Sequence, residues 1–266
     1  MKIASNGIHI NVTDQGSGTP AIVFLHYWGG SSRTWSDVIA AFPPVYRMVA
    51  PDHRGWGDSD APARGYALAD FADDAQGVID TLKLGQFVLV GHSMGGKIAQ
   101  LLASRRPKGL VGLVMVAPSP PVPLLLPAEV RAEMRNAYTS RASVEASIDH
   151  MLTARPLSPA HREQVIEDSL RGDPQAKTAW PTYTSLEDIT RQVAAINVPA
   201  IVIAGELDRV DSIETLRTQL IPHIPHARMH VVPSSGHLSP LEAPREVAGL
   251  IQEFVESLSV VKSRMT

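Results

Sequence analysis

The 266-residue sequence contains no cysteine. This absence excludes a disulfide framework, a thiolate nucleophile and any metal site built on thiolates. The sequence also lacks an apolar run long enough to span a bilayer, and its first residues lack the apolar stretch of a signal peptide. We therefore expect a protein without a membrane span that resides in the cytoplasm.

An excess of basic charge and a phosphate-binding motif are also missing. The net charge is −3, so the chain has no broad attraction for nucleic acid or anionic lipid. The glycines at 91, 95 and 96 have Ser93 between them and do not form a dinucleotide fingerprint. Nucleic acid is therefore not an expected partner. The composition, 44% hydrophobic and 19% charged, predicts a folded chain with a real core.

Short apolar runs alternate with longer helical patterns along the chain. Four runs have the length and composition of strands buried on both faces of a parallel sheet: 21–25, 87–90, 113–116 and 200–203. Helical patterns follow at 68–82, 94–104 and 242–258. This alternation predicts an α/β fold with a mostly parallel sheet flanked by helices. Residues 8–12 alternate between apolar and polar instead, which predicts a strand at an antiparallel edge.

One segment interrupts this alternation. Five prolines crowd residues 118–127, where they can continue neither a strand nor a helix. Only helical patterns follow until a strand-like run returns at 198. We predict that residues 118–186 form a helical lid over the carboxyl-terminal edge of the sheet. The core domain would then comprise residues 1–117 and 187–266.

The strongest chemical signal is Gly-His-Ser-Met-Gly at residues 91–95. The motif directly follows a predicted strand and directly precedes a predicted helix, which is the context of a nucleophile elbow. Its small residues let strand and helix approach closely, and the sharp turn lifts the serine hydroxyl out of the sheet. The helix N-terminus adds positive potential where an oxyanion would form. We therefore expect Ser93 to be a nucleophile.

A serine nucleophile needs a general base, usually a histidine, and an acid that orients this base. Of the ten histidines, His237 is favoured because it lies on a loop predicted at the sheet edge where Ser93 emerges. Asp208 is the first choice for the acid, with Asp211 second and Glu206 third. The chain order Ser, Asp, His is the order expected for a triad on this kind of turn.

Acyl transfer also needs N–H donors for the developing oxyanion. One donor is expected to be the backbone N–H of Met94, the residue after the nucleophile. The second is expected in the loop 26–30, which follows a predicted strand and contains two glycines that supply flexibility.

Taken together, these motifs resemble the α/β-hydrolase superfamily, and within it the small esterases and lactonase-like enzymes. The similarity covers nearly the whole chain. It rests on the loop 26–30 with Trp35, on 52–59, on the Ser93 turn, on 205–208 and on 236–237. The resemblance implies that the Trp28 N–H is the second oxyanion donor and that the loop 52–59 is mainly architectural.

The sequence departs from this family pattern at two positions of the loop 26–30. Tyr27 stands where glycine is common, and Gly29 stands where proline is common. We expect the Tyr27 side chain to reshape the loop or to enter the acyl pocket. Leu124 and Leu125 have no basic flank that would favour a membrane, so we expect them to cover a hydrophobic cleft.

Three histidines in the C-terminal part, at 223, 226 and 230, invite a zinc interpretation. Pro222 and Pro225 would break any helix that could align them. We therefore expect no metal site.

The hypothesis from the sequence is a serine hydrolase that cleaves a small-molecule ester or lactone through an acyl-enzyme, without a cofactor. Ser93 would attack the carbonyl, His237 would transfer the proton and Asp208 would orient His237. Two enzymatic alternatives use the same fold: cofactor-free perhydrolysis of the haloperoxidase-like kind, and carbon–carbon bond hydrolysis. A small-molecule receptor is the alternative from a different class.

Overall fold

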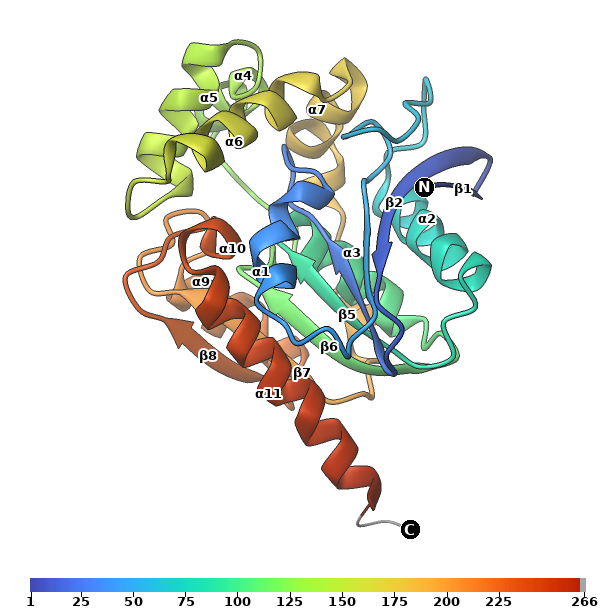
Figure 1. Cartoon of the computed structure of the whole chain (residues 1–266). Coiled ribbons are helices and arrows are strands. Elements are labelled where there is room, and N and C mark those ends of the chain that lie inside the picture. Colours follow the sequence, from blue (N-terminus) through green and yellow to red (C-terminus); the bar gives the residue numbers. More distant parts are fainter. Residues whose placement is uncertain (264–266) are drawn as a thin grey trace.

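Eight strands form one sheet in the computed structural model, which describes the backbone of residues 1–263 and the side chains of residues 1–258 (Figure 1). The strands are β1 (Lys2–Ser5), β2 (Ile8–Gln15), β3 (Ala21–Leu25), β4 (Met48–Pro51), β5 (Phe87–His92), β6 (Leu110–Val116), β7 (Ala200–Gly205) and β8 (Arg228–Val232). Their order is β1-β2-β4-β3-β5-β6-β7-β8. Strand β2 pairs antiparallel with β1 and β4, whereas the pairs from β4 to β8 are parallel. The predicted mostly parallel sheet is confirmed.

The central strands are apolar because helices cover both faces of the sheet. Along β3, Ile22 and Phe24 pack into one core cluster, and Val23 and Leu25 pack into the other. Successive side chains of a strand point to opposite faces, so a strand covered on both sides must be apolar throughout. The first face is covered by α1 (Ser36–Ala40) and α11 (Pro244–Ser263). The second is covered by α2 (Leu68–Thr81), α3 (Met94–Ser104), α8 (Thr190–Val193) and α9 (Ile213–Gln219).

Two of the predicted helices, 68–82 and 94–104, correspond to α2 and α3. The predicted helix 242–258 begins differently, because the short helix α10 (Ser239–Glu242) ends there and α11 begins at Pro244. Proline fits the first turn of a helix but not its interior, so a new helix starts at this residue. Among the helices of residues 1–263, none combines the length and apolar character needed to cross a membrane.

Residues 118–186 fold into helices. They comprise α4 (Ala128–Asn136), α5 (Arg141–Ser147), η2 (Ile148–Leu152), α6 (Pro159–Arg171), α7 (Pro174–Thr182) and η3 (Thr184–Leu186). Ser158 caps α6 and Asp173 caps α7, and a proline follows each cap in the first turn.

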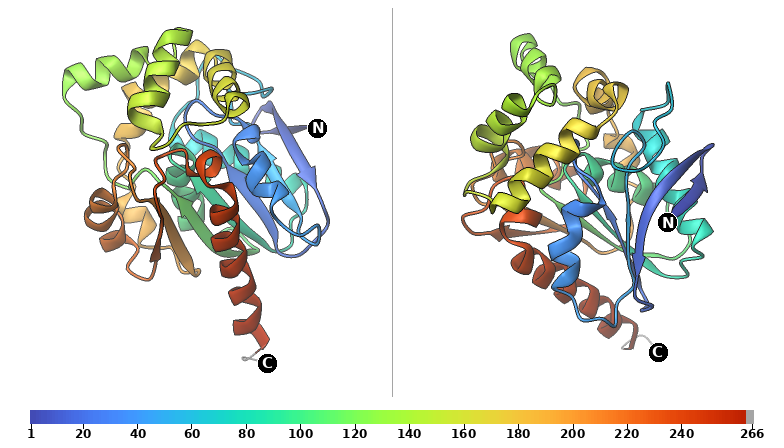
Figure 2. Two further views of the ribbon diagram at one scale, coloured as in Figure 1. Left: turned by 60° about the vertical axis from the view of Figure 1, so that its left-hand side comes forward. Right: turned by 45° about the horizontal axis from the view of Figure 1, so that its top comes forward.

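Helices α4 to α7 gather beyond one end of the sheet (Figures 1 and 2). Ser169 of α6 contacts Gly29 in the loop after β3, and Leu152 of η2 contacts Leu238 in the loop after β8. The segment therefore lies at the carboxyl ends of the parallel strands. Its use as a lid stays a prediction.

Candidate active site

Ser93 occupies a strained turn between β5 and α3. Its φ of 54° and ψ of −116° are values that residues other than glycine rarely adopt. A Cβ atom on Gly91 would overlap the carbonyl oxygen of Gly95, and one on Gly95 would overlap the carbonyl oxygen of Leu25. Glycine at both positions therefore lets the strand and the helix meet closely enough to form the turn.

A continuous chain of hydrogen bonds starts at the Ser93 hydroxyl. Ser93 Oγ lies 2.9 Å from His237 Nε2, and His237 Nδ1 lies 2.9 Å from Asp208 Oδ2. The other carboxyl oxygen of Asp208 accepts the backbone N–H groups of Val210, at 2.8 Å, and Asp211, at 3.1 Å. A proton on Nδ1 would be donated to Asp208, which leaves Nε2 free to accept the serine proton.

The two other candidate acids, Glu206 and Asp211, make no hydrogen bond to His237 among the residues that the structure describes. Glu206 accepts the backbone N–H of Ser234 at 2.7 Å. Asp211 donates its backbone N–H to Asp208, and the residue lines a cavity next to the segment 119–126. Of the three acids considered from the sequence, the structure brings Asp208 to His237.

The charges of Asp208 and His237 stabilise one another. Burial acts to lower the pKa of His237, but the charge and hydrogen bond of Asp208 outweigh it and raise the pKa above 6.5. Burial acts to raise the pKa of Asp208, but His237 and the backbone donors lower it below 3.8. Asp208 is therefore ionised at neutral pH and favours the imidazolium that forms when His237 accepts a proton.

His92 contacts the backbone of the residue that acts as the candidate base. Its Nε2 donates to the backbone carbonyl oxygen of His237 at 2.8 Å, whereas the Ser93 hydroxyl contacts His237 Nε2. Burial lowers the pKa of His92 to about 3, which keeps the ring neutral. The contact fixes the backbone that carries His237.

The two residues expected to donate to an oxyanion, Met94 and Trp28, lie at the start of α3 and in the turn after β3. Met94 is the first residue of α3, where backbone N–H groups have no acceptor within the helix. Trp28 lies in the turn after β3, and its carbonyl oxygen accepts the Tyr138 hydroxyl at 3.0 Å. The rings of these two residues stack with centroids 4.2 Å apart. The next carbonyl, that of Gly29, accepts the Ser169 hydroxyl at 3.0 Å.

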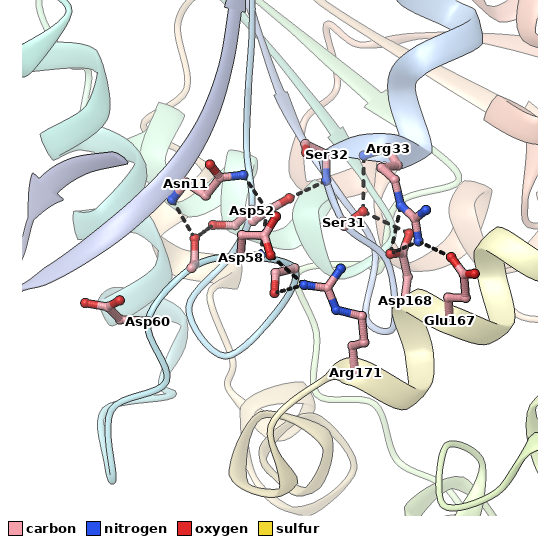
Figure 3. A network of polar contacts seen from close by, with 12 residues as sticks. Asn11, Ser31, Ser32, Arg33, Asp52, Asp58, Asp60, Glu167, Asp168 and Arg171 are labelled. Carbon is pink, nitrogen blue, oxygen red and sulfur yellow. Dashed lines mark hydrogen bonds and ion pairs between the residues drawn. The ribbon is translucent and has the colours of Figure 1, made fainter. Parts of the chain in front are cut away.

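A polar network joins helix α6 to the same loop (Figure 3). Ser31 donates to Asp168 at 2.8 Å, and Arg33 donates to Asp168 through Nε at 3.1 Å and Nη2 at 2.6 Å. Arg171, at the end of α6, pairs with Asp58 at 2.5 Å. Asp168 therefore bonds the segment 118–186 to the residues directly after the loop 26–30, and Arg171 bonds it to the loop 52–59.

The loop 52–59 makes contacts with neighbouring elements that are typical of a structural role. Asp52 accepts the backbone N–H groups of Ser32, at 2.6 Å, and Asp58, at 3.0 Å (Figure 3). Arg54 forms a buried pair with Asp74 of α2, with Nε 2.6 Å from Oδ2. These bonds tie the loop to the neighbouring turn and to the helix layer.

A cavity of about 490 Å³ opens between the segment 119–126 on one side and α9 with the loop before it on the other. Leu124 and Leu125, two of the predicted pocket residues, line it, and Leu125 is largely exposed at its mouth. The third, Tyr27, is buried with its ring 5.2 Å from the ring of His92 and is not among the lining residues. The structure therefore brings Leu124 and Leu125, but not Tyr27, to this cavity.

Sequence reasoning missed Tyr138, Ser169 and Lys97. Tyr138 and Ser169 lie more than a hundred residues from the loop they contact and carry no local motif. Lys97 could have been noticed in the sequence, because it is a charged residue within the apolar helical pattern 94–104. Its side chain is fully buried, and its ammonium group donates to the carbonyl oxygen of Val122 at 2.9 Å.

The C-terminal histidines are dispersed. His226 Nε2 contacts the carbonyl oxygen of Val198 at 3.0 Å, and His230 lies in β8. Within the part of the chain that the structure describes, no group of three histidine, aspartate or glutamate side chains is placed to hold a metal ion.

Comparisons with known proteins agree with this fold. A family profile described as alpha/beta hydrolase fold matches residues 20–244. The chain is 30% identical to a non-heme haloperoxidase of Rhodococcus erythropolis, over 96% of this chain and 98% of that protein. It is 28% identical to a 2-hydroxymuconate semialdehyde hydrolase of Pseudomonas putida, over 98% of this chain and 96% of that protein. The structure of an esterase from Exiguobacterium antarcticum superposes on this chain with a TM-score of 0.87 at 25% identity. The superposition covers 96% of this chain and 99% of the esterase.

Proposed function

This chain is a hydrolase of the alpha/beta hydrolase fold family, and from this premise we propose that it cleaves small carboxylic esters or lactones through an acyl-enzyme on Ser93. The observation that carries the proposal is the hydrogen-bond chain from Ser93 through His237 to Asp208, with 2.9 Å at both links. It unites a nucleophile, a general base and an ionised acid in a water-poor setting, which is what activation of a serine hydroxyl requires.

In the first half of the reaction, Ser93 Oγ attacks the carbonyl carbon while His237 Nε2 takes the hydroxyl proton. The backbone N–H groups of Met94 and Trp28 donate to the oxyanion of the tetrahedral intermediate. The intermediate collapses when the bond to the alcohol oxygen breaks and His237 gives its proton to that oxygen. In a lactone, the released alcohol stays attached to the acyl group.

In the second half, water attacks the acyl-enzyme and His237 takes a proton from it. Collapse of the second intermediate returns this proton to Ser93 and releases the carboxylic acid. No cofactor enters either half. Asp208 keeps His237 in one orientation throughout and stabilises its charged form.

The segment 118–186 acts in this scheme as a lid that also holds the second oxyanion donor. Tyr138 donates to the carbonyl oxygen of Trp28 and Ser169 donates to that of Gly29, at 3.0 Å each. These bonds restrain the two peptide units that follow the Trp28 N–H. Preorganised donors of this kind stabilise the transition state without reorganising during the reaction.

Similarity to proteins named as a haloperoxidase and as a semialdehyde hydrolase supports two further candidates. In perhydrolysis, hydrogen peroxide would replace water in the second half and the product would be a peracid. In carbon–carbon bond hydrolysis, the leaving group would be a carbanion equivalent that receives the His237 proton. Peroxide-dependent formation of a peracid would identify perhydrolysis. Cleavage of a β-diketone to a carboxylic acid and a ketone would identify carbon–carbon bond hydrolysis, and multiple turnover distinguishes an enzyme from a receptor.

A burst-phase assay with short and medium p-nitrophenyl esters tests the proposal. The wild type is expected to release a rapid burst of p-nitrophenol, stoichiometric with enzyme, followed by steady turnover. Ser93→Ala is expected to show neither. A wild type that is inert to every ester would contradict ester hydrolysis and leave carbon–carbon bond hydrolysis as the better candidate.

A further inference from the structure

Asp211 is a buried carboxyl group that the proposed reaction does not use. It lies in the loop between β7 and α9, where its backbone N–H donates to Asp208 Oδ1 at 3.1 Å. The residue is only 3% exposed. Among residues 1–258, no side chain or backbone N–H donates to its carboxyl oxygens. Buried polar groups are normally hydrogen-bonded, so this carboxyl group retains bonding capacity for a ligand.

Asp211 is one of the residues that line the cavity of about 490 Å³. Much of the remaining lining is apolar and includes Val122, Leu124 and Val210. Ser119 also lines the cavity, and its backbone N–H donates to the carbonyl oxygen of Ser93 at 3.1 Å. The cavity therefore adjoins the nucleophile turn on one side and the loop of the triad acid on the other.

Three charged or titratable groups act on Asp211. Asp208 and His237 lie on the triad side, and the ammonium group of Lys97 acts from α3. Lys97 donates to the carbonyl oxygen of Val122 instead of pairing with Asp211. Burial raises the pKa of Asp211 to about 8, although His237 and Lys97 act to lower it. At neutral pH the carboxyl group is therefore mostly protonated and can donate a hydrogen bond.

We propose that Asp211 is a specificity-determining residue that binds an uncharged oxygen substituent, a hydroxyl or keto group, on the ester or lactone attacked by Ser93. The carboxyl O–H donates to the substituent oxygen, and its second oxygen accepts when the substituent is a hydroxyl. The apolar lining holds the hydrocarbon around the substituent. This inference rests on the proposed function and names its substrate class.

Other substituents fit the cavity less well. A cation would require an ionised Asp211 beside the Asp208 carboxylate, and the ammonium group of Lys97 would repel it. A plain alkyl group would leave a buried carboxyl group without a partner, which costs free energy in the complex.

Matched substrates and two variants of Asp211 test the inference. The acyl series is p-nitrophenyl hexanoate with its 3-, 4- and 5-oxo derivatives, and the alcohol pair is ethyl butyrate with 2-hydroxyethyl butyrate. The wild type is expected to prefer at least one oxygenated substrate by about 10- to 100-fold in kcat/KM, the range for satisfying a buried partner. Asp211→Asn, which keeps a donor, is expected to retain part of this preference. Asp211→Val is expected to abolish it and to gain activity on the plain esters.

The control is Glu214→Val, which removes an exposed carboxyl group of α9 that does not line the cavity. This variant is expected to keep the wild-type preference. A uniform loss of activity on all substrates in Asp211→Val, with a shifted pH profile, would mean that Asp211 acts only on the triad and would overturn the inference. Equal activity of the wild type on every matched pair would also overturn it.

Binding to Ser93→Ala separates this inference from the proposed function, because it does not depend on turnover. By calorimetry, the preferred oxygenated ester is expected to bind about tenfold tighter than its plain counterpart. Adding Asp211→Val is expected to remove the difference while the protein remains folded by thermal unfolding. Equal affinities for every pair would overturn the inference whether or not the wild type hydrolyses esters.

Discussion

Ser169→Ala tests whether the segment 118–186 holds the loop 26–30, which carries the proposed oxyanion donor Trp28, in its active position. The Ser169 side chain is fully buried, and its hydroxyl donates to the carbonyl oxygen of Gly29 at 3.0 Å. Removing the hydroxyl leaves this carbonyl without that donor. We expect the free energy of unfolding to fall by about 1–3 kcal/mol, the usual cost of a buried group deprived of its partner.

The catalytic effect has an upper bound, because losing a whole oxyanion donor costs about 2.7–4 kcal/mol in kcat. Tyr138 still holds the adjacent carbonyl of Trp28 at 3.0 Å, so the loop shifts without detaching. We therefore expect kcat to fall about tenfold, which corresponds to roughly 1.4 kcal/mol. KM should change little, because the oxyanion exists only in the transition state and the intermediate.

The assay is the acylation rate in the burst phase, measured together with urea unfolding. Ser147→Ala is the matched control, since its hydroxyl donates at 2.9 Å to the carbonyl of Ser143 in its own helix. This control should acylate at the wild-type rate, and Ser169→Thr should recover most of the lost rate. If Ser169→Ala loses stability but acylates normally, the loop does not depend on the helical segment and the reasoning is refuted.

Three further predictions follow from the site and the core. The value of kcat/KM should fall as the pH decreases through the pKa of His237, because the protonated imidazole cannot act as a base. This decrease should have its midpoint above pH 6.5, since Asp208 raises the pKa of His237. A flat profile from pH 5 to 8 would contradict this. Asp208→Asn should lower kcat by about 10⁴-fold with little change in thermal unfolding, as measured by steady-state kinetics and calorimetry. Arg54→Ala should lower the free energy of urea unfolding by about 3–5 kcal/mol, because it leaves the buried Asp74 carboxylate unpaired. The exposed pair of Arg105 is the control, and an equal loss in Arg105→Ala would refute the argument.

Local motifs explain why much of the site could be predicted from the sequence. The turn around Ser93 depends on glycines two residues to either side, so its chemistry is encoded within five positions. The central strands could be recognised because burial on both faces makes them apolar throughout. Strand β4 (Met48–Pro51) was not predicted, because four residues show too little periodicity to separate a strand from a loop.

Contacts between distant segments explain the rest. Tyr138 and Ser169 reach the loop after β3 across 110 and 140 residues, so their partners depend on how the helices pack. Asp208 and Asp211 are three residues apart, and the turn between them decides that the Asp208 carboxyl group bonds His237 while Asp211 lines the cavity. The Tyr27 side chain was expected to reshape the loop 26–30 or to enter the acyl pocket. Its buried position against His92 depends on packing between distant segments, which no local pattern reveals.

Mass spectrometry of the enzyme quenched during the burst tests the covalent role of Ser93 most directly. With p-nitrophenyl butyrate, we expect intact protein heavier by one butyryl group, with the added mass on the peptide that contains Ser93. The Ser93→Ala protein should carry no such group. A butyryl group on another residue, or turnover without any acylated protein, would contradict the proposed acyl-enzyme mechanism.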